Sequence, residues 1–366
     1  MKIICNKNDL MNGLNIVLKA VSNKSTMSIL QCVLFDCTRG DIRLITNDTE
    51  LGIETVVPGT ILEKGVVAYD ANQISNYVRS LPDNDITIYA DADLNTLISC
   101  EKIKFTITGK NGDEFTYLPK IERTDGIYLS KISLKDLIRQ TIFSIADNDT
   151  NKMMKGEMFE INGDTLRVVS LDGHRISCRR IVLKNSYEYR KVIIPGKTLN
   201  EISKIISNNE DDDVVLFFSN NHVLFEFDET IVVSRLIEGD YFDIDKMLSA
   251  NFDISVKVNK KNFLDCISRA TLLIKEGDKK PVIVDINDES INLRVNSAIG
   301  SMHEELDCVK NGQDIKIGFN PKFLIDALKA IDDEDIVIHM VNSRTPCIIK
   351  DENESYIYLV LPINFV

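Results

Sequence analysis

Tryptophan is absent from this sequence, and histidine and proline are scarce, with four and eight residues among 366. Long apolar runs are lacking too, since none approaches the roughly 20 residues that a membrane-spanning helix needs. The first residues alternate between apolar and polar types and soon meet charge, a pattern that secretory signal peptides do not have. We therefore expect a protein that neither spans a membrane nor carries a leader.

Clustered metal ligands are also missing. The eight cysteines are scattered, none belongs to a Cys-x-x-Cys pair, and the four histidines are equally dispersed. Zinc sites need such ligands close together, so we expect no metal and no cofactor. Most of the cysteines lie among apolar residues, which is typical of reduced core cysteines in a cytosolic protein.

Acidic residues outnumber basic ones and give the chain a net charge of −13. Taken alone, this charge argues against binding to nucleic acid, because contacts with phosphates favour cationic surfaces. The inference holds only if the charge is spread evenly. At 366 residues the chain is long enough for two or three domains, so the distribution of charge among them matters.

Three segments of the chain align without gaps, at residues 68–88, 194–212 and 319–338. Apolar residues recur in each segment at the spacing of one helix face, and an acidic turn and a strand-like run follow. The matching positions lie 125 residues apart: Asn72, Lys197 and Lys322; Ile74, Leu199 and Leu324; Leu81, Ile206 and Ile331. Each segment is therefore predicted to form a helix followed by a strand.

A second amphipathic helix pattern also occurs three times, at residues 6–21, 133–146 and 259–274. Strand-like runs separate the two helices of each repeat. Within these runs the turns Arg-Gly-Asp, Asn-Gly-Asp and Asn-Asp-Glu predict hairpins.

These repeats predict an α+β fold made of three tandem copies of one domain, with two helices packed on antiparallel sheets. The repeat is far longer than that of solenoid proteins, so the copies are domains and not stacked elements. The expected domains are residues 1–124, 125–251 and 252–366.

Cations recur on one side of the three matching helices. In each helix two positions seven residues apart lie away from the apolar stripe, and five of the six residues there are basic. These pairs are Asn72 and Arg79, Lys197 and Lys204, and Lys322 and Lys329. One such helix is ordinarily a solvated surface, but recurrence in an acidic protein indicates segregated charge. We expect these faces to contact the phosphates of duplex DNA without reading its bases.

Tandem domains of this kind leave sheet edges exposed at both ends of the chain. Open edges promote aggregation, and pairing of two chains about a two-fold axis would cover them. The repeats therefore predict a homodimer that closes as a six-domain ring, with helices inside and sheets outside.

The stretch "SLDGHRIS" at residues 170–177 invites a different interpretation, because Asp172 and His174 stand where a hydrolase could use them. A nucleophile or a third orienting group is not evident, and such a site needs one. The first repeat has Asp48 at the matching position but no histidine, and an acid in a turn is more often a hydrogen-bonding cap. A further alternative is a peptide-binding scaffold that keeps this fold without encircling DNA, against which the five repeated cations argue.

Several motifs together identify a family. They are "SLPD" (80–83), "LDGHRI" (171–176), "VIIPGKTLNEISKI" (192–205), "SRLIEGDYFD" (234–243), "FNPKFLIDALKAI" (319–331) and "YLVLPI" (358–363). The chain resembles the bacterial DNA polymerase III beta subunit, the β sliding clamp, over its whole length. The resemblance implies a non-catalytic processivity factor, a homodimeric ring that encircles duplex DNA in the cytoplasm, at the nucleoid. It implies as partners the replicative polymerase catalytic subunit, the clamp loader, repair polymerases, and mismatch-repair and ligase proteins.

The resemblance also implies the residues of two surfaces. Those of a pocket for partner peptides are Met154, Leu171, Gly173, His174, Arg175, Ile176, Phe242, Lys246, Met247, Leu359, Leu361, Pro362 and Ile363. On this basis Gly173 would let a partner's backbone approach, and His174 and Arg175 would shape and hydrogen-bond the groove. The DNA-facing cations would be Lys24, Arg79, Lys197, Lys204, Lys322 and Lys329. Phe242 stands where the family usually has proline, and Asn364 where a cation is common, so the rim of the pocket is expected to differ.

Overall fold

The computed structural model describes residues 1–22, 27–147, 151–207, 212–249, 252–275, 280–351 and 353–365. The chain folds into two compact units. Unit 1 comprises Met1–Ile132 and Glu201–Leu236, and unit 2 comprises Ser133–Asn200 and Ile237–Val366. Within the described ranges, no helix is both long and apolar enough to cross a bilayer.

Unit 1 is built on two antiparallel sheets. The five-stranded sheet has the order β5 (Thr60–Glu63), β1 (Lys2–Asn6), β7 (Asp85–Ala90), β8 (Asn95–Cys100) and β9 (Ile103–Thr108). The nine-stranded sheet has the order β10 (Lys110–Asn111), β6 (Val66–Asp70), β2 (Cys32–Asp36), β3 (Ile42–Asn47), β4 (Leu51–Val57), β16 (Thr230–Arg235), β15 (His222–Phe227), β14 (Asp213–Phe218) and β11 (Ile127–Ser130). Strands β4 and β16 pair directly, so one continuous sheet joins the first repeat to part of the second.

The helices of unit 1 pack on one another and on these strands. They are α1 (Lys7–Val17) and α2 (Ala71–Ser80), with the 3₁₀ turns η1 (Leu18–Ala20), η2 (Ser28–Gln31) and η3 (Gly112–Glu114). Helix α1 contacts both α2 and β4. Helices α3 (Lys131–Thr141) and α4 (Gly196–Ile205) each have residues in both units.

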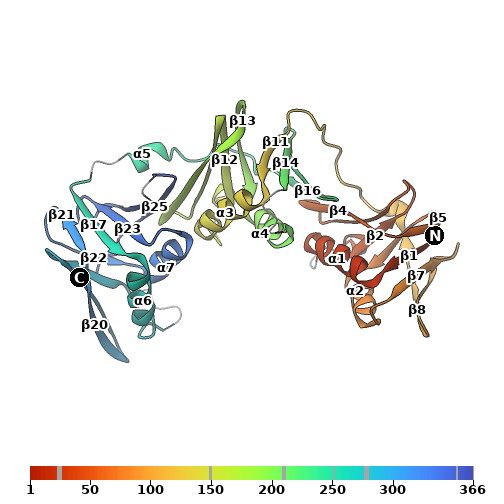
Figure 1. Ribbon diagram of the computed structural model, residues 1–366, viewed down its shortest axis with the longest axis horizontal. Helices are drawn as coiled ribbons and strands as arrows, with labels where there is room; N and C mark the ends of the chain where they lie inside the picture. The colour runs from red at the N-terminus through yellow and green to blue at the C-terminus, as the bar shows by residue number, and fades with distance from the viewer. Residues whose placement is uncertain are drawn as a thin grey trace. The chain divides into compact units, whose positions relative to one another are not determined.

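Unit 2 also contains two antiparallel sheets. The seven-stranded sheet has the order β12 (Gly156–Leu171), β13 (Arg175–Pro195), β25 (Tyr356–Val360), β24 (Cys347–Lys350), β23 (Asp335–Met340), β17 (Ile254–Asn259) and β21 (Val309–Asn311). The four-stranded sheet has the order β20 (Gly300–Asp307), β19 (Ser290–Ser297), β18 (Val282–Ile286) and β22 (Ile315–Phe319). The remaining helices are α5 (Asp245–Leu248), α6 (Lys260–Thr271) and α7 (Pro321–Ala330), with η4 (Ile142–Ser144) and η5 (Lys152–Lys155). Helices α6 and α7 lie side by side (Figure 1).

Four of the helices that follow a strand, α1, α2, α6 and α7, start with the same kind of side-chain cap. The last strand residue of β1, β6 and β17 is Asn6, Asp70 and Asn259, and Asn320 follows β22. The side chain of each accepts a hydrogen bond from a backbone N–H in the first turn of the helix. Asn and Asp side chains satisfy donors that a helix start leaves unpaired, so these residues fix where strand gives way to helix.

The apolar positions that repeat along the sequence form the core, as predicted. Leu10, Leu137 and Phe263 on the first helix of each repeat are at most 1% exposed. Ile74, Leu199 and Leu324 on the second helix are buried to the same degree. All eight cysteines are buried and unbonded to one another, in agreement with the expectation of reduced core residues.

One predicted hairpin is wrong. The Arg-Gly-Asp and Asn-Asp-Glu turns do connect paired strands, β2 with β3 and β18 with β19. The Asn-Gly-Asp turn instead lies inside β12, whose pairing with β13 continues on both sides of it. Gly163 takes a left-handed φ of 62° and the register shifts beside it, so the glycine accommodates a bulge and not a chain reversal.

Candidate functional site

The "SLDGHRIS" stretch forms the tight turn between β12 and β13. The Oδ1 atom of Asp172 accepts hydrogen bonds from the backbone N–H groups of His174 and Arg175, at 2.9 and 3.1 Å. Gly173 has a φ of 85°, in the left-handed region that favours glycine, and a Cβ there would meet nothing within 4 Å. Asp172 is thus occupied as the cap of a turn, which explains the acid and the glycine without catalysis.

Arg175 turns inward and holds this turn against helix α7. Its Nε donates to Oδ2 of Asp172 at 2.9 Å, and its Nη1 donates to Oδ2 of Asp326 at 2.7 Å. Its Nη2 donates to the carbonyl oxygen of Phe143, and its guanidinium lies 4.4 Å from the ring centroid of Phe323. These contacts use three of the five N–H groups of the guanidinium and tie the turn to α7. That Arg175 also hydrogen-bonds a peptide in the groove stays a prediction.

His174 also contacts helix α7. Its ring stacks on Phe323, with centroids 6.3 Å apart and an interplanar angle of 24°. Its carbonyl oxygen accepts a hydrogen bond from the N–H of Leu361 at 2.9 Å. The turn is thereby joined both to α7 and to the segment that follows β25.

Most of the apolar pocket residues predicted from the sequence come together in one cluster of unit 2. Leu171, Ile176 and Leu359 are buried in it, and Met154, Phe242 and Leu361 pack against it half-buried. Strand pairing sets this proximity, because Ile176 lies opposite Leu359 in the ladder of β13 and β25. A half-buried apolar surface of this kind suits aliphatic or aromatic anchors of a peptide.

The other predicted pocket residues lie around this cluster or away from it. Lys246 and Met247 are exposed on the short helix α5, where Lys246 pairs with Asp243 at 2.7 Å. Pro362 is half-buried, and the N–H of Ile363 donates to the carbonyl oxygen of Gly318 at 2.8 Å. That hydrogen bond directs the end of the chain along β22, so Ile363 is tied to a different sheet from Leu361.

A carboxyl group is buried beside the cluster. Glu157 is the second residue of β12 and is fully buried. Its carboxylate accepts a hydrogen bond from the hydroxyl of Thr141 at 3.0 Å. Its other oxygen has no hydrogen-bond partner among the described residues. Burial raises the pKa of Glu157 to about 8, and the hydrogen bond from Thr141 offsets only part of this effect. The group is therefore largely protonated at neutral pH.

The five described DNA-facing candidates are all exposed on the second helices of the repeats: Arg79, Lys197, Lys204, Lys322 and Lys329. Lys24 lies outside the described residues. Arg79, Lys204 and Lys329 are in the last turns of α2, α4 and α7, where cations stabilise the helix dipole.

Lys197 and Lys322 differ from these three, because each is the second residue of its helix. A cation in the first turn opposes the helix dipole and costs about 0.3–1 kcal/mol. The helix dipole therefore does not account for the presence of these two lysines.

Sequence reasoning missed two residues of this region, Phe323 and Asp326. Both lie on α7 between the two lysines of its exposed face, and both hold the turn at residues 172–174. The sequence does offer a signal for Asp326, because an acid stands there on a helix face whose other charged residues are Lys322 and Lys329. No group of three or more His, Cys, Asp or Glu side chains in the described part of the chain could hold a metal ion.

Comparison with known proteins covers the whole chain. The models of the N-terminal, central and C-terminal domains of the DNA polymerase III beta subunit match residues 1–119, 128–243 and 245–364. The beta sliding clamp of Staphylococcus epidermidis is 32% identical in an alignment of 374 positions that covers 99% of each chain.

Solved structures agree with this similarity. A putative DNA polymerase III beta subunit from Eubacterium rectale is 59% identical, with a TM-score of 0.98 over 100% of this chain and 99% of that one. The DNA polymerase sliding clamp of Bacillus subtilis is 30% identical, with a TM-score of 0.97 over all of both chains.

Proposed function

The chain belongs to the family of bacterial DNA polymerase III beta subunits, the non-catalytic sliding clamps of DNA replication. On that premise we propose which of its surfaces contacts DNA and which binds partner proteins. The second helices of the repeats face encircled duplex DNA. The cluster beneath the turn at residues 172–174 receives peptides of partner proteins. The three tandem domains have the boundaries 1–124, 125–251 and 252–366.

The observation that carries the proposal for DNA is the placement of lysines in helix first turns. Lys197 and Lys322 recur 125 residues apart at a position where a lysine weakens the helix, in a chain with a net charge of −13. A ring that is linked topologically to DNA needs only weak and mobile phosphate contacts. An acidic exterior then suppresses adhesion, while a few inward cations guide sliding.

Partner peptides dock on the apolar cluster formed by Leu171, Ile176, Leu359, Leu361 and Met154. The flexible thioether of Met154 lets the surface adapt to different partners. These partners are the replicative polymerase catalytic subunit, the clamp loader, repair polymerases, and mismatch-repair and ligase proteins. The protein works in the cytoplasm, at the nucleoid.

Phe242 and Asn364 set the peptide preference of this rim. The ring of Phe242 packs edge-on against Tyr241, with centroids 5.7 Å apart, and Asn364 is exposed. An aromatic side chain in place of proline offers a larger contact surface, and an amide in place of a cation removes an attraction for acidic peptides.

Two chains close the ring by pairing the edges of their outer sheets. Strand β9 is an edge strand of the five-stranded sheet, and β20 is an edge strand of the four-stranded sheet. No described strand pairs with the outer edge of either. Apolar side chains are exposed near both: Ile103 on β9, Ile299 in the turn before β20, and Leu272 at the end of α6, a helix that contacts β20. Such edges invite pairing with another chain, and a two-fold axis lets each copy supply both.

Retention on circular DNA tests encirclement directly. The protein is loaded by a clamp loader onto a nicked circular plasmid and separated from free protein by gel filtration. We expect it to elute with the circle and to be released once a restriction enzyme makes the plasmid linear. Equal retention on both forms would favour the alternative of a peptide-binding scaffold that does not encircle DNA.

A further inference from the structure

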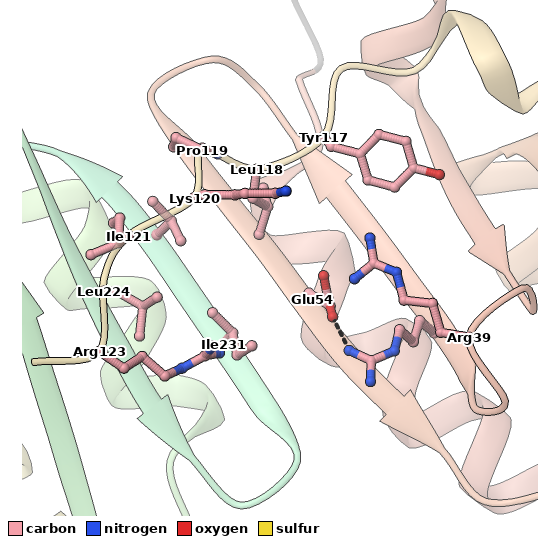
Figure 2. A pocket seen from close by; sticks show the side chains of 12 residues that line it. Arg39, Glu54, Tyr117, Leu118, Pro119, Lys120, Ile121, Arg123, Leu224 and Ile231 are labelled. Atoms are coloured by element: carbon pink, nitrogen blue, oxygen red, sulfur yellow. Dashed lines mark hydrogen bonds and ion pairs between the residues drawn. The ribbon is translucent and has the colours of Figure 1, made fainter.

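Unit 1 contains a groove of about 610 Å³ that the clamp function does not use. It lies where the linker at residues 115–126 crosses the paired strands β4 and β16 (Figure 2). A groove of this size is within the range of ordinary ligand sites. Every residue that lines it belongs to unit 1, whereas the candidate peptide pocket belongs to unit 2.

The linker packs against the sheet at two points, Leu118 and Ile121. Gly52 on β4 has no side chain, and a Cβ there would overlap the Leu118 side chain, so Leu118 packs directly over the strand. Ile121 is buried in a cluster with Phe217, Leu224 and Val233. These contacts leave an apolar floor beneath a segment that is itself held in place.

The repeat explains why this groove differs from the candidate peptide pocket. Gly52 matches Ile176, 124 residues later, on the pocket wall. In the first repeat the space that a larger wall residue would fill is taken by the linker's own Leu118. An apolar side chain of the linker thus already occupies the place that Ile176 has in the second repeat.

Four cations and one carboxylate line the groove, and only some of these cations are neutralised. Arg43 pairs with both Glu54 and Asp41, and Arg123 pairs with Glu226 at 2.6 Å. Each of these two arginines thus already has a carboxylate partner.

The remaining two cations are available to a ligand. Arg39 has a side chain that is 55% exposed, and the carboxylate nearest to it is that of Asp36, at 3.9 Å. Lys120 is exposed, and within the described ranges it has no ion pair. Figure 2 shows both side chains extending into the open space between the linker and β4, below the ring of Tyr117.

We propose that this groove binds an acidic, extended peptide segment of a partner protein. Carboxylates of the peptide pair with Arg39 and Lys120, and an apolar side chain rests on Leu224, Ile231 and Val233. Charge complementarity favours this occupant, because a strongly acidic protein presents here a small cationic rim above an apolar floor. Nucleic acid fits less well, since a phosphate backbone needs a row of cations and offers nothing to the apolar floor.

The probes for the test are fluorescein-labelled octapeptides that carry one Leu, Ile or Phe flanked by four Asp or Glu residues. Matched octapeptides carry Lys in place of the acids. Fluorescence anisotropy at low salt measures binding to the whole protein. We expect the acidic set to bind more tightly than the lysine set, and increasing salt to weaken it.

Variants then locate the binding. Arg39→Glu with Lys120→Glu should weaken the acidic peptides about tenfold or more, because each reversal replaces an attraction by a repulsion. Lys64→Glu, an exposed lysine of the same unit outside the groove, is the matched control and should change affinity less than twofold. Equal thermal unfolding of the variants shows that the fold is intact.

Three results would overturn the proposal. The first is equal binding of acidic and lysine peptides. The second is unchanged affinity in the double variant, or loss of binding on Leu361→Ala, which would place the probe in the peptide pocket of unit 2. The third is capture of a 20-base-pair duplex, abolished by the same double variant, which would make the groove a nucleic-acid site. All of these binding measurements use protein that has not been loaded onto DNA. Their outcome is therefore independent of whether the chain encircles DNA.

Discussion

Arg175 and Asp326 form an ion pair of 2.7 Å that joins the turn after β12 to the middle of helix α7. The arginine side chain is 7% exposed and the aspartate side chain 23% exposed, so water screens the pair only in part. The same arginine pairs with Asp172 at 2.9 Å. The wall of the candidate peptide pocket and the helix that carries Lys322 and Lys329 are therefore one connected piece of unit 2.

Removal of the arginine should destabilise the protein. Arg175→Met leaves Asp172 and Asp326 without their cation, and the loss of one partner from a buried pair costs about 3 kcal/mol. The urea midpoint of unit 2 should fall, as followed by circular dichroism. Lys261→Ala, at an exposed lysine of unit 2, is the control and should shift stability by no more than about 0.5 kcal/mol. Equal midpoints for Arg175→Met and the native chain would contradict the structural role.

The buried carboxyl of Glu157 predicts a dependence of stability on pH. The pKa of this group is 4.5 ordinarily, and burial raises it to about 8 in the folded chain. The folded state therefore keeps the proton where the unfolded chain has released it. The contribution of this proton to the free energy of unfolding is complete below pH 4.5 and is lost as the pH rises through 8.

Glu157→Gln removes this titration and should make the protein more stable than the native chain at pH 8 and above. Each unit of pKa shift corresponds to about 1.4 kcal/mol, so the gain should exceed that amount. Urea midpoints measured from pH 5 to pH 9 should slope downward for the native chain and be flatter for the variant. Glu122→Gln, an exposed glutamate, should keep the native slope. Parallel profiles for all three proteins would show that Glu157 ionises normally.

The lysines of the helix first turns should show opposite effects on folding and on DNA. Lys197→Gln with Lys322→Gln removes two unfavourable interactions with helix dipoles and should leave stability equal or slightly higher, by up to about 1 kcal/mol. Loading on nicked circular DNA should weaken, and its dependence on salt should become shallower by about 0.9 for each phosphate that is no longer neutralised. Lys204→Gln with Lys329→Gln should weaken loading too, but with a small decrease in stability. Unchanged loading in both double variants would remove these helices from the DNA-facing surface.

Peptide binding should depend on the apolar cluster and not on dimerisation. Truncation before Leu361 should abolish binding of partner peptides and leave the dimer intact. Because truncation also removes the hydrogen bonds of Leu361 to His174 and of Ile363 to Gly318, Leu361→Ala is the cleaner variant. Isothermal titration with a peptide from the polymerase catalytic subunit measures the decrease in affinity. Phe242→Pro is expected to retain binding with altered peptide preference, and full affinity for every peptide in Leu361→Ala would exclude the pocket.

Exposed apolar residues at the two sheet edges should control assembly. Leu272 has a side chain among the most exposed apolar ones described, and Leu272→Glu would bring a charge to the end of α6, which contacts β20. Native mass spectrometry should find dimers of the unaltered chain at micromolar concentration and monomers of the variant. Val182→Glu, at an equally exposed valine of β13, is the matched control and should stay dimeric. A monomeric native chain would undercut the ring.

Local patterns in the sequence were sufficient to predict the helices of the repeats and two of the three hairpins. Ile74, Leu199 and Leu324 repeat at one spacing, and side chains spaced along a helix face must share an environment, so their burial follows. The exposed cations opposite them follow for the same reason. The Asn-Gly-Asp prediction failed because a left-handed glycine serves a bulge as well as a turn, and only the pairing of β12 with β13 distinguishes them.

The sequence by itself determined three repeats, their helix faces and the segregation of charge, because these depend on residues close together in the chain. The direction of the Arg175 side chain was decided by tertiary structure, since Asp326 is remote in sequence and reaches it only through the packing of α7. The same is true of Glu157, whose raised pKa comes from burial by distant segments. The groove under the linker exists because Gly52 leaves room for Leu118, a packing arrangement that neither residue reveals alone.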